Sequence, residues 1–304
     1  MSEIRPGSPA AWMAAIRPKT LPVGLAPVVM GWAVAAAHGG GVNRPAVSIA
    51  AVTALLLQIL SNLANDLFDF KKGADGPDRQ GPVRAMAAGL LTRRQMTGGI
   101  LLVAALALVS GSFLVVAGGW VFGVLGIAAV LCALAYTGGP FPLGYHGLGD
   151  LFVFLFFGPV AVCGTTFLAG GQVPPASWPC AVAVGCLSVN VLVVNNLRDA
   201  AQDALSGKRT LVVRFGRRAG IGQYAGNLSV SFASALVLPA LDVPLTAILI
   251  LVLVPSAVVM TRQLMRAKDG PSMNRLLASS ARFVLVFVAL LSAGMLTGTW
   301  CLLR

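Results

Sequence analysis

Asparagine and aspartate side chains gather where a long apolar run of the sequence ends. Asn62, Asn65, Asp66 and Asp69 lie close together there. On a helix these four positions fall within an arc of about 100° and so share one face. Because carboxylates at the edge of an apolar core are costly, such a face usually serves a cation, a charged partner or a water-filled cavity. The stretch is therefore a candidate site.

A second stretch repeats this arrangement farther along the chain. Asn195, Asp199 and Asp203 follow another apolar run, each four residues after the last, which places them on one face of a helix. Two like clusters predict two facing sides of one cavity. The two stretches and the loop after the first hold six of the ten acidic residues: Asp66, Asp69, Asp75, Asp78, Asp199 and Asp203.

Aspartates on two facing helices, with lysines and arginines in the adjoining loops, suit a diphosphate bridged by Mg²⁺. Mg²⁺ prefers oxygen ligands and is usually held by one or two carboxylates together with substrate phosphates. Lys and Arg then neutralise the remaining phosphate charge. At a membrane interface the natural ligand is a lipid diphosphate, whose tail would lie among the apolar segments. Mg²⁺ on the leaving diphosphate would favour ionisation of an allylic C–O bond.

Two other interpretations fit acidic residues at helix ends. The aspartates could form salt bridges with Lys71, Lys72 or Arg198 and only set helix packing, although matching spacing in two motifs argues against this. A cation-coupled transporter also keeps carboxylates beside a cavity. Transporter sites, however, tend toward the bilayer midplane, whereas these acids lie at the ends of apolar runs. Mg²⁺-dependent release of diphosphate would distinguish an enzyme from a transporter.

The composition is that of an integral membrane protein. Hydrophobic residues make up 57% of the 304 residues and charged residues only 11%, whereas a soluble domain carries about 25% charged residues. We expect a single polytopic domain over residues 1–304. The first apolar run is followed by eight more, so it is interpreted as a retained span and not as a cleaved signal peptide. The nine expected spans cover about residues 20–38, 45–68, 96–117, 119–137, 149–170, 176–197, 219–240, 243–261 and 282–302.

The net charge of +12 is distributed to one side of these spans. Apart from Arg44 and Arg304, the 22 Lys and Arg residues fall in the N-terminal segment and in alternate loops. This positive-inside pattern predicts a multi-pass protein of the cell (inner or plasma) membrane. Its N-terminus and both acidic motifs would be cytoplasmic and its C-terminus outside, with no nucleic-acid partner. The five cysteines lie in or beside apolar runs without CxxC spacing, which is typical of packing residues.

The two aspartate-rich motifs carry a family resemblance. Asn-Asp-Leu-Phe-Asp at 65–69 continues to Asp75, and Asn-Leu-Arg-Asp at 196–199 continues to Asp203. They resemble the motifs of the UbiA superfamily of intramembrane prenyltransferases. The long spacing from Asp69 to Asp75 favours its naphthoate branch, whereas the last three spans match only in hydropathy. Five segments are similar to the 1,4-dihydroxy-2-naphthoate polyprenyltransferases of menaquinone biosynthesis: residues 17–22, 78–84, 136–139, 195–199 and 207–211.

This resemblance implies an all-α membrane protein with nine transmembrane helices around a central cavity, capped by cytoplasmic loops. It implies Mg²⁺-dependent transfer of a polyprenyl group from polyprenyl diphosphate to 1,4-dihydroxy-2-naphthoate. The ring carboxylate would leave as carbon dioxide, giving demethylmenaquinone. Another aromatic acceptor, such as a hydroxybenzoate, is the alternative within the superfamily. The partners implied are the two substrates, the lipid bilayer and two Mg²⁺ ions.

The resemblance also implies roles for individual residues. Those expected to hold Mg²⁺ are Asn65, Asp66, Asp69, Asp75, Asp199 and Asp203. Those expected to bind substrate are Asn62, Asn65, Arg79, Arg84, Asn195, Asn196, Arg198 and Lys208. Those expected to take part in catalysis are Asp66, Asp69, Asp199, Asp203 and, near the reacting carbon, Tyr136.

One loop departs from the family pattern. Relatives commonly place a Lys or Arg after the Tyr-Thr-Gly-Gly segment, whereas this chain has Phe-Pro-Leu-Gly at 141–144. A basic contact to phosphate is therefore missing there, or another residue such as Arg198 or Arg209 supplies it.

Overall fold

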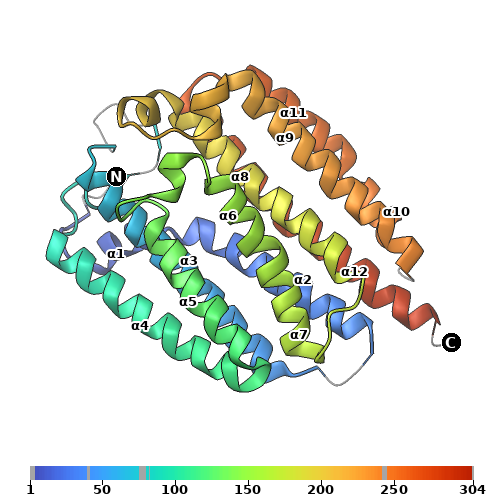
Figure 1. Ribbon diagram of the computed structural model, residues 1–304. Helices are drawn as coiled ribbons and strands as arrows, with labels where there is room; N and C mark the ends of the chain where they lie inside the picture. The colour runs from blue at the N-terminus through green and yellow to red at the C-terminus, as the bar shows by residue number, and fades with distance from the viewer. Residues whose placement is uncertain (1–3, 40–41, 75–79, 82, 242–244, 303–304) are drawn as a thin grey trace.

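The chain folds into one bundle of long helices. The computed structural model describes residues 4–39, 42–74, 80–81, 83–241 and 245–302, and within these ranges there is no β-strand. The N-terminus and the C-terminus lie at opposite ends of the bundle (Figure 1). The described part of the chain is therefore all-α, as the apolar runs predict.

The helical elements follow one another closely except at residues 72–92, a long connection of which the structure describes only part. The first half contains α1 (Pro9–Ile16), η1 (Pro18–Thr20), α2 (Leu21–Ala37), α3 (Arg44–Lys71), α4 (Arg93–Gly118), α5 (Trp120–Ala135) and η2 (Leu143–His146). The second half contains α6 (Gly149–Leu155), η3 (Phe156–Cys163), α7 (Gly164–Gly170), α8 (Ser177–Leu205), α9 (Leu211–Val237), η4 (Leu238–Leu241), α10 (Leu245–Leu251), α11 (Val254–Arg266) and α12 (Gly270–Leu302).

Most of the predicted spans are long enough to cross a bilayer. In the part of the chain that the structure describes, eight helical segments have the length and hydropathy of membrane spans. The predicted run near 119–137 forms α5, whose 16 residues fall short of the roughly 20 that a spanning helix needs. The protein is thus a multi-pass membrane protein, and the count of nine spans stays a prediction.

Three helices extend beyond the apolar runs that predict them. The helix α8 continues past residue 197 to Leu205, and α12 begins at Gly270 instead of near 282. The element α9 begins at Leu211 instead of near 219, but a break at Gly216 (φ 80°, ψ 173°) separates its first turn from the long helix that follows. Hydropathy marks the part of a helix suited to lipid, whereas the backbone hydrogen bonds continue into polar turns. The second acidic motif therefore lies wholly within α8.

A π-helical segment interrupts the span formed by α6 and α7. Pro159 lies inside this segment, η3, and its missing N–H removes one hydrogen bond of a regular helix. A π turn, whose hydrogen bonds join residues five apart in place of four, can accommodate the missing hydrogen bond. The segment places Phe156, Phe157 and Val160 on the wall of an internal cavity.

Three apolar clusters hold the described part of the bundle together, and two of them include residues within the two motifs. One cluster joins α2, α8, α9 and α12, and most of α8 is buried within it. A second joins α1, α3 and α4 with a connecting segment that includes Met86 and Leu91. The first motif, on α3, and the second, on α8, thus belong to different clusters.

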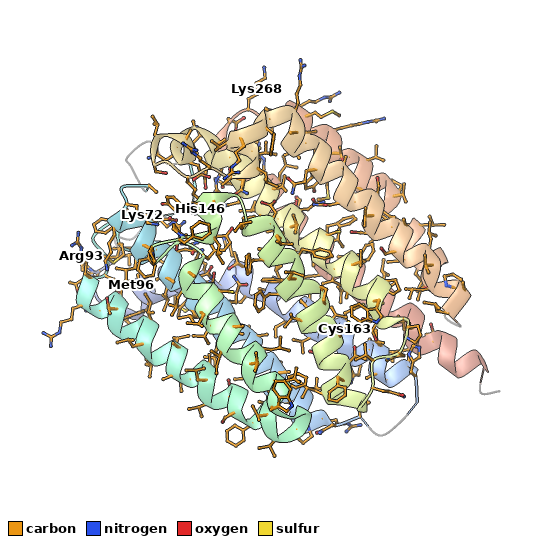
Figure 2. The ribbon with its side chains drawn as sticks, in the orientation of Figure 1. Lys72, Arg93, Met96, His146, Cys163 and Lys268 are labelled. Carbon is orange, nitrogen blue, oxygen red and sulfur yellow. The ribbon has the colours of Figure 1, made fainter. Side chains whose placement is uncertain are left out.

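The connections that carry polar residues meet at one end of the bundle, which we call the loop end. The Gly7 N–H donates to the Leu90 carbonyl at 2.8 Å, and the Arg209 N–H donates to the Tyr145 carbonyl at 3.0 Å. Lys72 and His146 lie at this end, whereas Cys163 lies far from it (Figure 2). The loops after both motifs are therefore brought together.

Candidate active site

The first motif is helical from Asn62 through Asp69, since α3 ends at Lys71. The Asn62 amide donates to the Ile16 carbonyl at 2.8 Å and lies 3.2 Å from the Thr20 hydroxyl oxygen. The Asn65 side-chain oxygen accepts from the Thr137 hydroxyl at 2.9 Å. The two amides thus fix α3 against neighbouring segments at the loop end.

Asp66 faces a loop and not the cavity. Its side chain is fully buried, and its two oxygens accept the backbone N–H groups of Ala85 and Met86, each at 3.0 Å. The Arg17 guanidinium lies 4.0 Å away. Consecutive helix residues point about 100° apart, so Asp66 diverges from Asn65. Its contacts anchor the segment after the first motif.

Asp69 lies at the boundary between this anchored loop and the cavity. It is buried and accepts from the Arg84 guanidinium at 3.3 Å and from the Tyr145 hydroxyl at 3.2 Å. The fixed loop at Ala85 is adjacent to Arg84 and so delivers this arginine to Asp69. Asp66 thereby positions the positive charge of Arg84 beside Asp69.

The second motif is organised by ion pairs. Arg198 contacts Asp199 through two hydrogen bonds, of 2.8 and 2.6 Å, and also donates to the Asn195 side-chain oxygen at 2.7 Å. The Lys208 ammonium lies 3.4 Å from one Asp203 oxygen. The other oxygen, Asp203 Oδ2, is buried and accepts no hydrogen bond from the described residues.

Lys208 connects the two motifs electrostatically. Burial lowers the pKa of its ammonium, but the charges of Asp69, Asp203 and Asp199 outweigh burial and raise the pKa above its ordinary value. Its neighbours come from both α3 and α8, and the side chain lines the cavity. The protein thus keeps a positive charge where the motifs face each other.

Tyr136 lies at the same polar region, directly after α5. Burial raises the pKa of its phenol, and the charges of Asp150, Asp203 and Asp69 add to this effect, so the hydroxyl keeps its proton at neutral pH. A Cβ at position 149 would lie 2.7 Å from the Tyr136 oxygen. Gly149 therefore makes room for this tyrosine.

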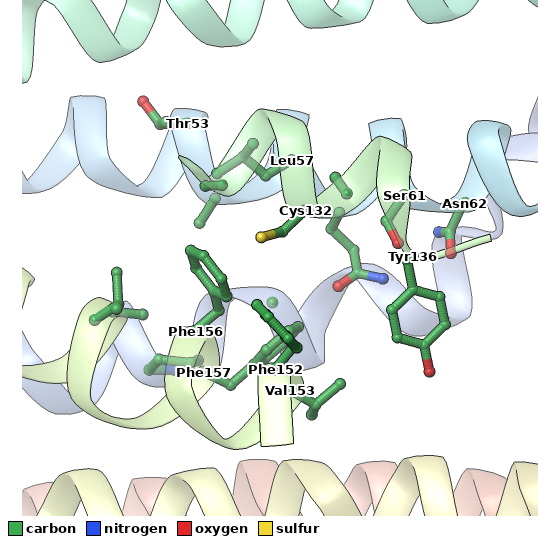
Figure 3. Close-up of a pocket in the computed structure, with 18 of the residues that line it drawn as sticks. Thr53, Leu57, Ser61, Asn62, Cys132, Tyr136, Phe152, Val153, Phe156 and Phe157 are labelled. Atoms are coloured by element: carbon green, nitrogen blue, oxygen red, sulfur yellow. The ribbon is translucent and has the colours of Figure 1, made fainter. Parts of the chain in front are cut away.

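An internal cavity of about 360 Å³ extends from this polar end into the bundle. Figure 3 shows Tyr136, Ser61 and Asn62 at one end and Phe152 and Phe156 farther along. The polar side chains on its wall include Arg17, Gln58, Asn62, Asn65, Asp69, Arg84, Tyr136, Asn195, Asn196 and Lys208, and its apolar wall includes Val28, Leu57, Leu114, Phe122, Leu125, Phe152, Phe156, Phe157, Val160 and Leu168. The shape suits a molecule with a charged head and a hydrocarbon tail.

The predicted site residues divide into three groups. Those on the cavity wall are Asn62, Asn65, Asp69, Arg84, Tyr136, Asn195, Asn196 and Lys208. Among the predicted residues that the structure describes, those beside the cavity but off its wall are Asp66, Arg198, Asp199 and Asp203. The remaining two, Asp75 and Arg79, lie outside the described residues.

Four residues near the site lie outside the set predicted to hold metal, bind substrate or take part in catalysis. Arg17 lines the cavity, and Tyr145 contacts Asp69. The Lys72 ammonium lies 4.0 Å from the centre of the Tyr145 ring. Asn274, on α12, accepts from Arg198 at 2.8 Å. Arg17 belongs to a segment of family resemblance and could have been found, whereas Asn274 follows no motif.

The side chains present fit a divalent cation that prefers oxygen. Across the described residues, no three His, Cys, Asp or Glu side chains form a ready-made metal centre. Even so, the buried oxygen Asp203 Oδ2 has no partner among them, and Asp69 and Asn65 add oxygens from the facing helix. Such a site would be completed by phosphate oxygens, as Mg²⁺ sites commonly are.

Comparisons with known proteins agree with this arrangement. The chain is 36% identical over 308 residues to the 1,4-dihydroxy-2-naphthoate octaprenyltransferase of Escherichia coli (strain K12), covering 99% of each chain. It is 40% identical over 212 residues to the protein of the same name from Haemophilus influenzae, covering 67% of this chain and 69% of that one. A solved UbiA homolog from Archaeoglobus fulgidus, bound to DMAPP and Mg²⁺, shares the fold with a TM-score of 0.63 at 15% identity, covering 92% of this chain and 99% of that one.

The family model confirms the expected membership. The model of the UbiA prenyltransferase family matches residues 24–291, a range that includes both motifs and every residue of the cavity wall except Arg17. Because that match covers most of the chain and a relative aligns over nearly its full length, this chain belongs to the UbiA prenyltransferase family.

Proposed function

We propose that this protein transfers a polyprenyl group from polyprenyl diphosphate to 1,4-dihydroxy-2-naphthoate. One observation carries the proposal: a single cavity joins the polar side chains of both motifs to a long apolar wall. A diphosphate requires the first surface and a prenyl chain the second. The naphthoate acceptor is supported by the relative of that activity that aligns along the whole chain.

Two Mg²⁺ ions are proposed to bind between the motifs. Asn65 and Asp69 would act from α3, with Asp75 beyond it, and Asp199 and Asp203 from α8. Mg²⁺ supplies positive charge to the leaving diphosphate. Arg198 takes one acceptor position on each Asp199 oxygen, and a carboxylate oxygen has further lone pairs to offer.

Asp66 receives a different role in this proposal. Both of its oxygens already accept backbone N–H groups and its side chain is fully buried, whereas the Asp199 side chain, which is also paired at both oxygens, keeps 12% exposure. We therefore assign Asp66 to anchoring the loop that positions Arg84, instead of to the metal and catalytic roles expected from the motif.

The remaining polar residues are proposed to bind and orient the diphosphate. Arg84 and Lys208 place two positive charges on the cavity wall beside Asp69. Asn195 and Asn196 offer amide groups from the facing helix. Asn62 holds α3 in register, and Arg79 would add charge from the loop. Arg198 is assigned to ordering the second motif, since its contacts are with that motif.

The reaction breaks two bonds and forms one. The allylic C–O bond breaks and its electron pair leaves with the diphosphate, which the cations of the chain stabilise. The resulting allylic cation lies among apolar and aromatic side chains, including Phe152 and Phe156, that exclude water. The electron-rich ring then forms the new C–C bond and loses its carboxylate as carbon dioxide. The protonated Tyr136 hydroxyl would orient a substrate oxygen.

The same proposal includes an orientation in the cell membrane. The loop end carries the N-terminal segment and the basic connections around Lys72, Arg84 and Lys208. By the positive-inside rule this end faces the cytoplasm. The helix α12 runs away from it, which would place the C-terminus outside.

The test is turnover of the purified protein in detergent. Farnesyl diphosphate would be offered with 1,4-dihydroxy-2-naphthoate or with a hydroxybenzoate, in Mg²⁺ or in excess chelator. Prenylated 1,4-dihydroxynaphthalene and carbon dioxide formed only with Mg²⁺ would support the proposal. Product from hydroxybenzoate alone would refute the acceptor, and diphosphate release independent of Mg²⁺ would refute the mechanism.

A further inference from the structure

Arg198 is a buried cation whose hydrogen bonds are shared among several partners. Its side chain is 1% exposed, and its donors contact both Asp199 oxygens and the Asn195 side-chain oxygen. One terminal nitrogen, Nη1, donates outside the motif, to Asn274 Oδ1 on α12 at 2.8 Å. A buried guanidinium needs such partners because an unmet donor is costly away from water.

Asn274 uses both halves of its amide. While its oxygen accepts from Arg198, its nitrogen donates to the Gln80 carbonyl at 2.9 Å. Gln80 also lies against the start of α12, where a Cβ on Gly270 would lie 2.8 Å from the Gln80 Cβ and 3.3 Å from the Gln80 carbonyl oxygen. One side chain thus joins α12, the second motif and the connection that follows the first motif.

We propose that Asn274 is a positioning residue for the metal and diphosphate site, acting through Arg198 on Asp199 and Asn195. The inference rests on the proposed function. Without the Asn274 oxygen, Arg198 Nη1 loses its hydrogen-bond acceptor. The guanidinium that contacts Asp199 and Asn195 is then no longer held in one position. Residues that orient metal ligands commonly change metal affinity or activity about 10–100-fold when removed.

The experiment compares Asn274→Ala with two other variants in detergent. Asn274→Asp keeps an acceptor oxygen for Arg198 but loses the donor to Gln80. Asn227→Ala is the matched control, since Asn227 donates to Asn190 at 2.9 Å between α9 and α8, away from both motifs. The readouts are the Mg²⁺ concentration for half-maximal turnover and the rise in unfolding temperature caused by farnesyl diphosphate with Mg²⁺.

Asn274→Ala should raise the half-maximal Mg²⁺ concentration about tenfold and shrink the ligand-induced temperature rise. Asn274→Asp should recover both, and Asn227→Ala should change neither, even if it lowers the unfolding temperature of the free protein. Unchanged Mg²⁺ dependence in Asn274→Ala would overturn the inference. So would equal shifts in Asn227→Ala, or no recovery in Asn274→Asp.

Two provisions keep the result interpretable. If Asn274→Ala does not accumulate as folded protein, Asn274→Ser takes its place, because its shorter side chain cannot span the distance to Arg198. Absence of Mg²⁺-dependent turnover in the unmodified protein would refute the proposed function. A normal unmodified protein with a normal Asn274→Ala or Asn274→Ser variant would refute only the role of Asn274.

Discussion

Replacing Asp66 by asparagine should destabilise the protein more than it alters its use of Mg²⁺. The carboxylate accepts two backbone N–H groups at 3.0 Å. Hydrogen bonds to charged groups contribute about 1.5–3 kcal/mol each. Asparagine keeps one oxygen and turns an NH₂ group toward the other donor, so about one such bond is lost. We expect unfolding to become easier by about 1.5–3 kcal/mol.

The assay separates folding from metal use. Thermal unfolding in detergent should show Asp66→Asn melting several degrees below the unmodified protein, because the Met86 segment and Arg84 lose their anchor. Turnover per folded molecule should reach half its maximum at nearly the same Mg²⁺ concentration. An unchanged melting temperature together with a large rise in that Mg²⁺ concentration would refute the anchoring role and restore Asp66 as a ligand.

Two further substitution experiments follow from the contacts of the motifs. Asp69→Asn should reduce turnover about a hundredfold at limiting Mg²⁺ and should lower the melting temperature, because it weakens the buried ion pair with Arg84. Asp199→Asn should likewise lower the melting temperature, because breaking a buried pair with Arg198 costs about 3–5 kcal/mol; an unchanged melting temperature in either variant would contradict this. The pKa of Lys208 in the folded protein lies above its ordinary value. The charged ammonium therefore contributes its full stabilisation below the unfolded pKa of about 10.4. This stabilisation is lost as the pH rises through the folded pKa. The melting temperature should therefore fall above about pH 10, and it should fall less in Lys208→Met. Identical plots of melting temperature against pH for the two proteins would argue against the ion pair between Lys208 and Asp203.

Residue type and spacing predicted the helices and the polar end of the cavity because both follow from local rules. An apolar run must hydrogen-bond its own backbone in lipid, so α3 and α8 could be expected from hydropathy. Spacing also placed Asn62 and Asp69 on one face. The same rule treated Asp66 as equivalent to them, since an arc of about 100° is wide enough to meet two different neighbours.

Long-range partners could not be predicted in this way. Asn274 lies 76 residues beyond Arg198 in the chain, on a helix whose sequence indicates only an apolar scaffold. Its role depends on how α12 packs against α8, which is set by the whole core and not by a local motif. Similarly, the sequence around Pro159 does not show that its π turn forms part of a cavity wall, because the wall exists only once the neighbouring helices pack against it.

The loop that lacks the expected basic residue shows how packing can replace a missing charge. Neither suggested substitute lines the cavity: Arg198 is engaged with Asp199, and the Arg209 side chain is exposed. Instead, the loop presents the Tyr145 ring, with the Lys72 and Lys208 ammonium groups 4.0 and 5.8 Å from its centre. Cations are attracted to an aromatic face, so this loop gathers charge from two other segments beside Asp69. The departure from the family pattern therefore moves the source of the charge without removing charge from the site.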